Sequence, residues 1–130
     1  MHELSIALSI VELAERHARE QHTTATRIEE IELEIGALAA VDTDALDFAL
    51  ESAVKNTLAK TAKITRHIIP GEGICETCGV RVSMETPCKP CPRCASWQIR
   101  LTRGKELRVK SIVVDDYSKM RELLFSISPP

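Results

Sequence analysis

The chain has 130 residues, of which 44% are hydrophobic, enough for one ordinary core but too few for two domains of usual size. Its net charge of -2 is unevenly distributed: residues 1–70 carry 12 acidic and 7 basic side chains, whereas residues 71–115 carry 5 and 8. Aromatic residues make up 3% of the chain, too few for a base-stacking surface, and the sequence has neither a secretory signal nor an apolar run of about 18 residues. We expect a cytoplasmic protein that contacts neither nucleic acid nor membrane.

The first predicted element is an amphipathic helix over residues 4–20. Leu4, Ala7, Leu8 and Val11 recur at helical spacing and are expected on its buried side. Glutamates stand four residues before arginines on the other side, which is the favourable order for ion pairs on a helix.

Three later segments predict strands. Ile31, Leu33 and Ile35 alternate with glutamates, the pattern of a strand with one buried face. Residues 61–69 and 107–114 are rich in β-branched side chains and predict two more.

Two further helices are expected. Asp42 or Thr43 can cap a second helix whose apolar stripe extends to Leu58. Residues 117–125 predict a short terminal helix, and residues 126–130 a frayed end.

The predicted fold class is α+β, with two helices packed on a three-stranded sheet and an inserted four-cysteine zinc-ribbon lobe. The insert starts where one strand ends and finishes where another begins. We therefore expect one domain formed by residues 1–70 plus 106–130, and a zinc-ribbon domain formed by residues 71–105.

A metal site is predicted by two Cys-x-x-Cys pairs separated by twelve residues: Cys75, Cys78, Cys91 and Cys94. Each pair can make a tight turn that directs both sulfurs at one ion, and two such turns complete a tetrahedron around structural Zn(II). Four thiolates leave no position for a water nucleophile, so the site is not expected to be hydrolytic. Because the insert has few apolar residues, metal binding of about 10–16 kcal/mol would supply most of its folding free energy.

Alternatives to this ligand set remain open at this point. Cys88 forms a second possible pair with Cys91, although we prefer to interpret it as a spare thiol. Ala95 follows the second pair where Gly79 follows the first, and alanine adopts a left-handed turn less easily than glycine. An iron site with four sulfurs would use the same pattern, but the aromatic wrapping of such a site is missing.

A second metal site is suggested by His2. The amine of Met1, the backbone nitrogen of His2 and its imidazole can form fused chelate rings around Ni(II) or Cu(II). By itself, a histidine at this position is more simply explained as an exposed chain end.

The combination of motifs resembles the HypA/HybF family of hydrogenase nickel incorporation proteins. The similarity rests on Met1-His2-Glu3, on Glu32-x-Glu34-Ile35-Gly36, on the two cysteine pairs, and on residues 104–112, which read GKELRVKSI. It extends to about Asp115, beyond which the chain is longer than is typical of that family.

The resemblance implies a metallochaperone, not an enzyme. It implies that Met1, His2 and Glu3 hold Ni(II) as transient cargo, with a fourth donor left open, and that the four paired cysteines hold Zn(II). It also implies the GTPase HypB and the large subunit of [NiFe] hydrogenase as partners, with urease maturation factors as further ones.

Two other classes of function compete with this interpretation. A zinc-ribbon module that binds nucleic acid or protein would use six basic side chains, namely Arg93, Arg100, Arg103, Lys105, Arg108 and Lys110. A metal-dependent hydrolase could use His2 and Glu3, but the sequence has no His-Glu-x-x-His motif and no phosphate-binding loop.

Overall fold

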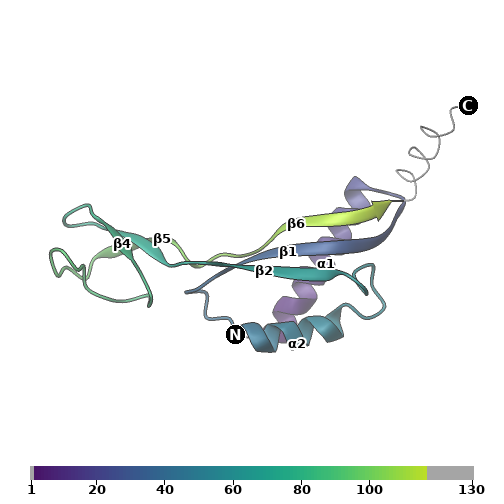
Figure 1. Ribbon diagram of the computed structural model, residues 1–130, viewed down its shortest axis with the longest axis horizontal. Coiled ribbons are helices and arrows are strands. Elements are labelled where there is room, and N and C mark those ends of the chain that lie inside the picture. Colours follow the sequence, from purple (N-terminus) through teal and green to yellow (C-terminus); the bar gives the residue numbers. More distant parts are fainter. Residues whose placement is uncertain (1, 117–130) are drawn as a thin grey trace, which may run out of the picture. The chain divides into compact units, whose positions relative to one another are not determined.

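The computed structural model describes residues 2–116 (Figure 1). These residues form two compact units, which are described separately: the first comprises residues 2–32, 42–65 and 109–116, and the second comprises residues 33–41 and 66–108. The predicted terminal helix at residues 117–125 and the end of the chain at 126–130 lie outside the described residues.

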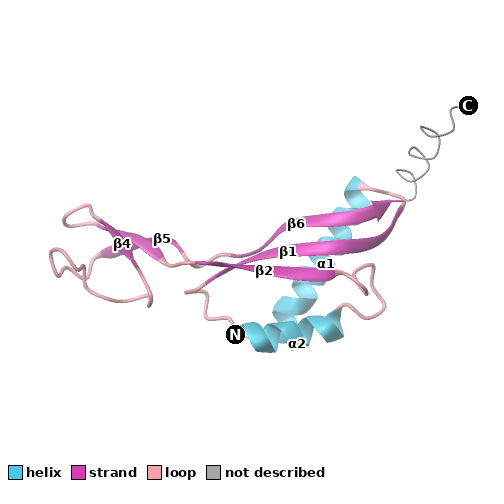
Figure 2. Cartoon of the chain, viewed as in Figure 1, coloured by secondary structure: helices cyan, strands magenta, loops and turns pink. Residues whose placement is uncertain are grey.

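Two helices and two three-stranded sheets make up the described chain (Figure 2). One sheet has the strand order β2-β1-β6 and the other β4-β3-β5. The predicted α+β class is therefore confirmed, and the cysteine-rich insert carries a sheet of its own. In chain order the elements are α1 (Glu3–Gln21), β1 (Ala25–Gly36), α2 (Thr43–Ala53), β2 (Lys63–Ile69), β3 (Glu72–Cys75), β4 (Arg81–Ser83), β5 (Ile99–Arg103) and β6 (Leu107–Asp116).

The core of the first unit lies between its helices and the central strand β1. Ile28 and Ile31 of β1 and Leu46 of α2 are fully buried. The alternation predicts burial of Ile31, whereas Ile28 lies three residues earlier and outside that period. Helix α1 buries a narrower stripe than its spacing predicts, because Leu4 and Leu8 remain 54% and 51% exposed. The buried side of α1 consists largely of alanines, which allow close packing against the neighbouring elements.

Helix α2 starts where the sequence predicts but ends earlier. The Asp42 carboxylate accepts a hydrogen bond from the Ala45 N–H at 3.1 Å, a standard N-terminal cap. The helix stops at Ala53 instead of continuing to Leu58. Three residues later Asn56 has φ of 62°, a left-handed conformation that asparagine tolerates better than most residues and that a helix cannot contain.

The insert begins and ends beside one short segment of the second unit. Three consecutive backbone N–H groups donate hydrogen bonds to carbonyls at the two ends of the insert. The Gly36 N–H donates to Glu106 at 2.6 Å, the Ala37 N–H to Ile69 at 2.8 Å, and the Leu38 N–H to Gly104 at 2.7 Å. Gly36 is required there, because a Cβ at this position would overlap the Gly104 carbonyl. The two ends of the insert are therefore held together by main-chain hydrogen bonds.

Within the insert, β3 is the central strand. It pairs antiparallel with β4 and with β5, and places Gly73 between Val82 and Leu101 on the inner face. A register shift follows Glu72, whose carboxylate lies 3.3 Å from Arg81 and 3.7 Å from Arg103. Throughout residues 2–116, no helix is long and apolar enough to cross a bilayer.

Candidate metal centre

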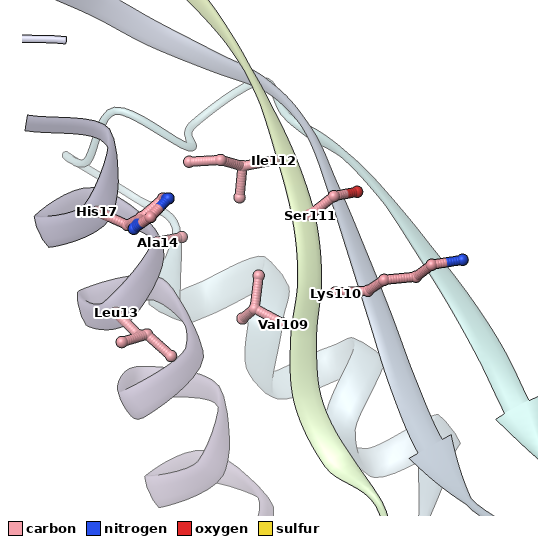
Figure 3. Close-up of a pocket in the computed structure, with 7 residues that line it drawn as sticks. All are labelled: Leu13, Ala14, His17, Val109, Lys110, Ser111 and Ile112. Atoms are coloured by element: carbon pink, nitrogen blue, oxygen red, sulfur yellow. The ribbon is translucent and has the colours of Figure 1, made fainter. Parts of the chain in front are cut away.

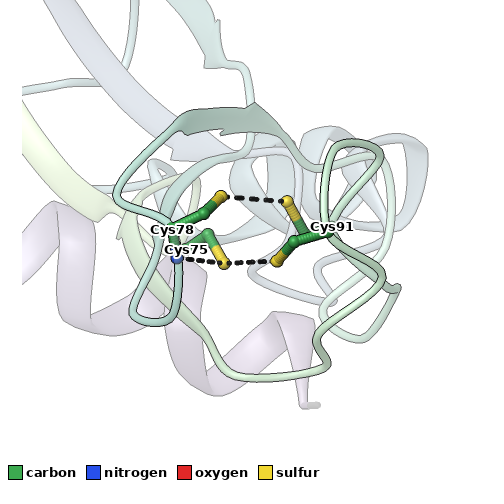
Figure 4. Close-up of side chains that lie close together, drawn as sticks. Cys75, Cys78 and Cys91 are labelled. Carbon is green, nitrogen blue, oxygen red and sulfur yellow. Dashed lines mark hydrogen bonds between the residues drawn. The ribbon is translucent and has the colours of Figure 1, made fainter.

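The sulfurs of Cys75, Cys78, Cys91 and Cys94 lie close together in the insert. Figure 4 shows Cys75, Cys78 and Cys91 in this group. All four lie within 4.8 Å of one another, with Sγ–Sγ distances of 3.5 Å between Cys75 and Cys94 and 3.7 Å between Cys78 and Cys91. A tetrahedron with Zn–S bonds of about 2.3 Å has edges of about 3.8 Å. The residues present thus fit a tetrahedral metal ion, and the distances are far too long for disulfide bonds of about 2.05 Å.

The two cysteine turns have the same backbone geometry. The Gly79 N–H donates to the Cys75 carbonyl at 2.8 Å, and the Ala95 N–H donates to the Cys91 carbonyl at the same distance. Gly79 and Ala95 have φ of 78° and 61°, so both adopt the left-handed conformation. Alanine accepts at this position the conformation that glycine adopts freely, which costs about 1–2 kcal/mol.

The turns are anchored in a small apolar cluster. Cys75 and Cys91, the first cysteine of each pair, are buried, and they pack with Leu38, Val82 and Met84. The second cysteine of each pair is exposed. Any metal held here would have one side against protein and one side near solvent.

Backbone amides favour the thiolate form of the two buried cysteines. The Cys78 N–H, 3.5 Å from the Cys75 sulfur, lowers the pKa of Cys75 to about 6 despite the effect of burial. The pKa of Cys91 is lowered in the same way, chiefly by the Cys94 N–H. The Ser96 N–H also favours the Cys94 thiolate, but desolvation and the neighbouring sulfurs outweigh it and raise the pKa of Cys94 to about 12. Of these three cysteines, Cys94 is therefore the one whose environment favours the thiol form.

Cys88 is exposed and stands outside the group of four. Its carbonyl accepts a hydrogen bond from the Thr86 hydroxyl at 3.0 Å, and Lys89 beside it pairs with Glu85 at 2.9 Å. The structure thus assembles the four cysteines that the spacing favours and places the fifth elsewhere.

The second predicted site lies at the start of α1. His2 is exposed, has an extended backbone, and its side chain makes no capping hydrogen bond to the helix. Its carbonyl accepts the first helical hydrogen bond, from the Ile6 N–H at 3.1 Å. Met1 lies outside the described residues.

A contact that the sequence did not predict links Glu3 to the start of α2. The Glu3 carboxylate accepts a hydrogen bond from the Asp42 N–H at 3.3 Å. The two residues are 39 positions apart, and no local pattern reveals their proximity. The structure therefore brings the N-terminal ends of both helices together beside the candidate nickel residues.

Taken together, the fold and the sulfur group define a small α+β protein with a four-cysteine centre that can hold a metal ion. A family model described as "Hydrogenase/urease nickel incorporation, metallochaperone, hypA" matches residues 1–114. The chain belongs to this HypA family, as its sequence motifs predicted.

Relatives support the same assignment. The chain is 50% identical over 114 residues to the hydrogenase maturation factor HypA of Parabacteroides distasonis. The aligned region covers 88% of this chain and 97% of the relative. It is 37% identical to the protein of that name from Prosthecochloris aestuarii, over 88% of this chain and 100% of the relative. The solution structure of the Ni metallochaperone HypA from Helicobacter pylori matches with a TM-score of 0.64 and 28% identity, over 88% of this chain and 97% of that one.

Proposed function

We propose that this chain binds Ni(II) at its N-terminus and delivers it for insertion into the large subunit of [NiFe] hydrogenase, working with the GTPase HypB. Urease maturation factors are further proposed partners. The observation that carries this proposal is the family match from residue 1 to residue 114, together with a His2 side chain that is exposed and uninvolved in capping α1.

In this proposal the nickel ligands are the Met1 amine, the His2 backbone nitrogen and the His2 imidazole. The first N–H groups of a helix have no partner within the helix, so the His2 N–H is not committed to α1, although the His2 carbonyl accepts from the Ile6 N–H. A helix N-terminus disfavours a cation by about 0.3–1 kcal/mol. The Glu3 carboxylate, held by the Asp42 N–H at 3.3 Å, supplies nearby negative charge that offsets this effect.

The proposed metal of the four-cysteine centre is structural Zn(II). The 3.5 and 3.7 Å sulfur separations support a tetrahedral ion, and a closed set of four thiolates suits a structural role. Residues 71–105 would then be a zinc domain, and residues 1–70 with 106–130 the domain that carries nickel.

Nickel titration tests the N-terminal site. We expect His2→Ala, and a variant with one residue added before Met1, to weaken nickel binding at least tenfold, because each removes a donor from the chelate. His22→Ala is the matched control, since His22 stands at the opposite end of α1. Unchanged affinity in both test variants would exclude the site, whatever the zinc centre does.

The competing module that binds nucleic acid receives less support from the geometry. Three of its six basic side chains pair with carboxylates of the same chain: Arg103 with Glu72 at 3.7 Å, Arg108 with Glu34 at 2.6 Å, and Lys110 with Glu32 at 4.0 Å. A steep decrease of DNA or RNA affinity with salt would favour that function over metal delivery.

A further inference from the structure

The outer face of the insert's sheet carries a row of three side chains, one from each strand. The strand pairing places Ile74 of β3 opposite Arg81 of β4 and Arg100 of β5, and directly opposite residues share one face of a sheet. The buried Val82 and Cys75 alternate with them and belong to the other face. The Arg81 side chain is 80% exposed, Arg100 is exposed and Ile74 is half-buried. The row is therefore an apolar side chain between two accessible cations.

The positive charge of this face is only partly neutralised by the chain itself. Glu72 is the single acidic residue of β3, β4 and β5. Its carboxylate lies 3.3 Å from Arg81 and 3.7 Å from Arg103. Arg100 has no ion pair with any residue between 2 and 116. Because a guanidinium presents five N–H donors in a planar fork, Arg100 can accept a carboxylate from outside the chain.

Helix α2 carries the complementary pattern. It contains three acidic residues and no basic one. Asp44, Phe48 and Glu51 follow one another at spacings of four and three residues, which places them along one face of the helix. Asp44 and Glu51 are exposed and form no ion pair within the described part of the chain. Phe48 is 77% exposed. This face is therefore an accessible apolar side chain between two anions.

The two patterns also match in length. From Asp44 to Glu51 the helix rises about 10.5 Å, at about 1.5 Å per residue. From β4 to β5 the sheet spans about 9.6 Å, since neighbouring strands lie about 4.8 Å apart. A helix laid across the strands would thus set Phe48 over Ile74, with a carboxylate beside each arginine. The guanidinium groups would also be attracted to the face of the phenyl ring.

Other surfaces of the first unit lack this chemistry. A groove of about 460 Å³ lies between α1 and β6 (Figure 3), but its lining includes His17 and Lys110 and no carboxylate. On α1 the glutamates are interspersed with arginines, and Glu15 pairs with Arg19 at 3.2 Å. The face of α2 is therefore the one that suits the arginines of the insert.

We propose that α2 of one copy of this chain lies across the outer face of the insert of a second copy. Phe48 packs on Ile74 in this contact, and the carboxylates on either side of Phe48 pair with Arg81 and Arg100. The contact joins two different faces, so it can form twice in a two-fold pair or repeat along a row of copies. It uses neither the proposed nickel residues nor the cysteine sulfurs.

Sedimentation of the full chain over a wide range of concentration tests the association. We expect the mean mass to rise above that of one chain as the concentration increases, and to fall again at high salt, which screens exposed ion pairs. A single-chain mass at every concentration would overturn the proposal. A single chain that instead binds a DNA or RNA oligonucleotide, with a steep salt dependence, would also overturn it, because the arginines would then serve nucleic acid.

Charge reversal identifies the two faces. Arg100→Glu and Glu51→Arg should each weaken association by about tenfold or more, since each brings like charges together in the contact. Lys105→Glu and Glu20→Arg are the matched controls, because both residues are exposed and lie outside the two rows. The controls should leave association unchanged. Equal effects of a test variant and its control would show unspecific charge attraction and would contradict the contact.

The apolar centre of the contact is tested in the same way. Phe48→Ala should weaken association by about tenfold or more, because a buried aromatic side chain at the centre of an interface contributes strongly to binding. Leu8→Ala is the control, since Leu8 is 51% exposed on α1. Neither substitution touches the buried core, so both variants should fold. A Phe48→Ala chain that associates like the unchanged protein would refute the predicted packing.

Mixing variants distinguishes a contact between two copies from other causes of association. Chains with Phe48→Ala and chains with Arg100→Glu should regain association when mixed, because the intact α2 of one meets the intact insert of the other. Chains with Phe48→Ala and chains with Glu51→Arg, both altered in α2, should not. Equal masses in the two mixtures would overturn the proposal. These measurements need no nickel, so the inference stands or fails separately from the delivery function.

Discussion

The two units of this chain reach a buried interior by different means. In the first unit, Ile28, Ile31 and Leu46 are completely buried by helices packed on a sheet. In the second, the buried cluster around the cysteines contains three apolar side chains and two thiols, with three half-buried apolar side chains packed against it. Burial of apolar surface stabilises by about 25 cal/mol per Å², so such a small cluster contributes little. The comparison suggests how a short chain can add a lobe: in the proposed zinc-bound form, the metal centre would supply stability that the small cluster around the cysteines lacks.

The largest effect should come from removing a proposed zinc ligand. Zinc binding contributes about 10–16 kcal/mol to folding in small zinc peptides. We expect Cys75→Ser to lose bound zinc and the protection of β3–β5 amides while α1 stays protected. Elemental analysis and hydrogen exchange measure both, with Cys88→Ser as the matched control because Cys88 lies outside the cluster. A zinc-loaded, fully protected Cys75→Ser protein would refute the closed four-thiolate site.

The reverse experiment weakens the apolar core of the first unit. Leu46 is completely buried, so Leu46→Ala should lower the free energy of unfolding by about 2–5 kcal/mol. Urea denaturation followed by circular dichroism measures the loss, and zinc content should remain unchanged. The comparison would fail if this substitution released the zinc as readily as Cys75→Ser.

Acidification should affect the second unit through its thiolates. The folded-state pKa of Cys75, about 6, lies below its ordinary value of 9.0. The thiolate therefore stabilises the folded insert fully at a pH above that ordinary pKa. This contribution is lost as the pH falls through about 6. Apparent zinc affinity should therefore decrease more steeply below pH 6 than above it, by about an additional tenfold per pH unit. Competition with a chelator between pH 5 and pH 8 measures the slope, and a constant slope would contradict the assignment.

The smallest expected effect concerns the two residues that follow the cysteine turns. Gly79 has φ of 78°, and a Cβ there would meet nothing within 4 Å, so Gly79→Ala should cost only backbone strain of about 1–2 kcal/mol. Ala95→Gly should act in the opposite direction, by less, because glycine also gains freedom in the unfolded chain. The zinc dissociation rate of each variant is compared with that of the unchanged protein. Faster dissociation from Ala95→Gly than from the unchanged protein would argue against strain at Ala95.

Patterns enforced by strong periodicity were predictable from the sequence. Ile31, Leu33 and Ile35 alternate with glutamates, and all three are at most 1% exposed. The spacing of the cysteines likewise singles out the four residues whose sulfurs converge in the structure. In both cases one dominant requirement, a dry sheet face or a tetrahedral ion, determines which residues occupy which positions.

Features that depend on tertiary contacts were not predictable. The stripe beyond α2 continues to Leu58, but the helix stops at Ala53, and the Leu58 N–H donates instead to the Glu15 carboxylate at 3.0 Å. The contact between Glu3 and Asp42 joins residues that are distant in sequence and carries no periodic signal. Such contacts follow from how the elements pack, and local spacing does not encode them.

The hydrogen bonds made by the N–H groups of residues 36–38 have a consequence for loss of the proposed zinc. Both arms of the insert remain fastened at their base, so the entropy of closing a long loop does not have to be overcome again when an ion returns. Reloading would then be a local rearrangement of two turns on a fixed stem, faster than refolding from an open chain.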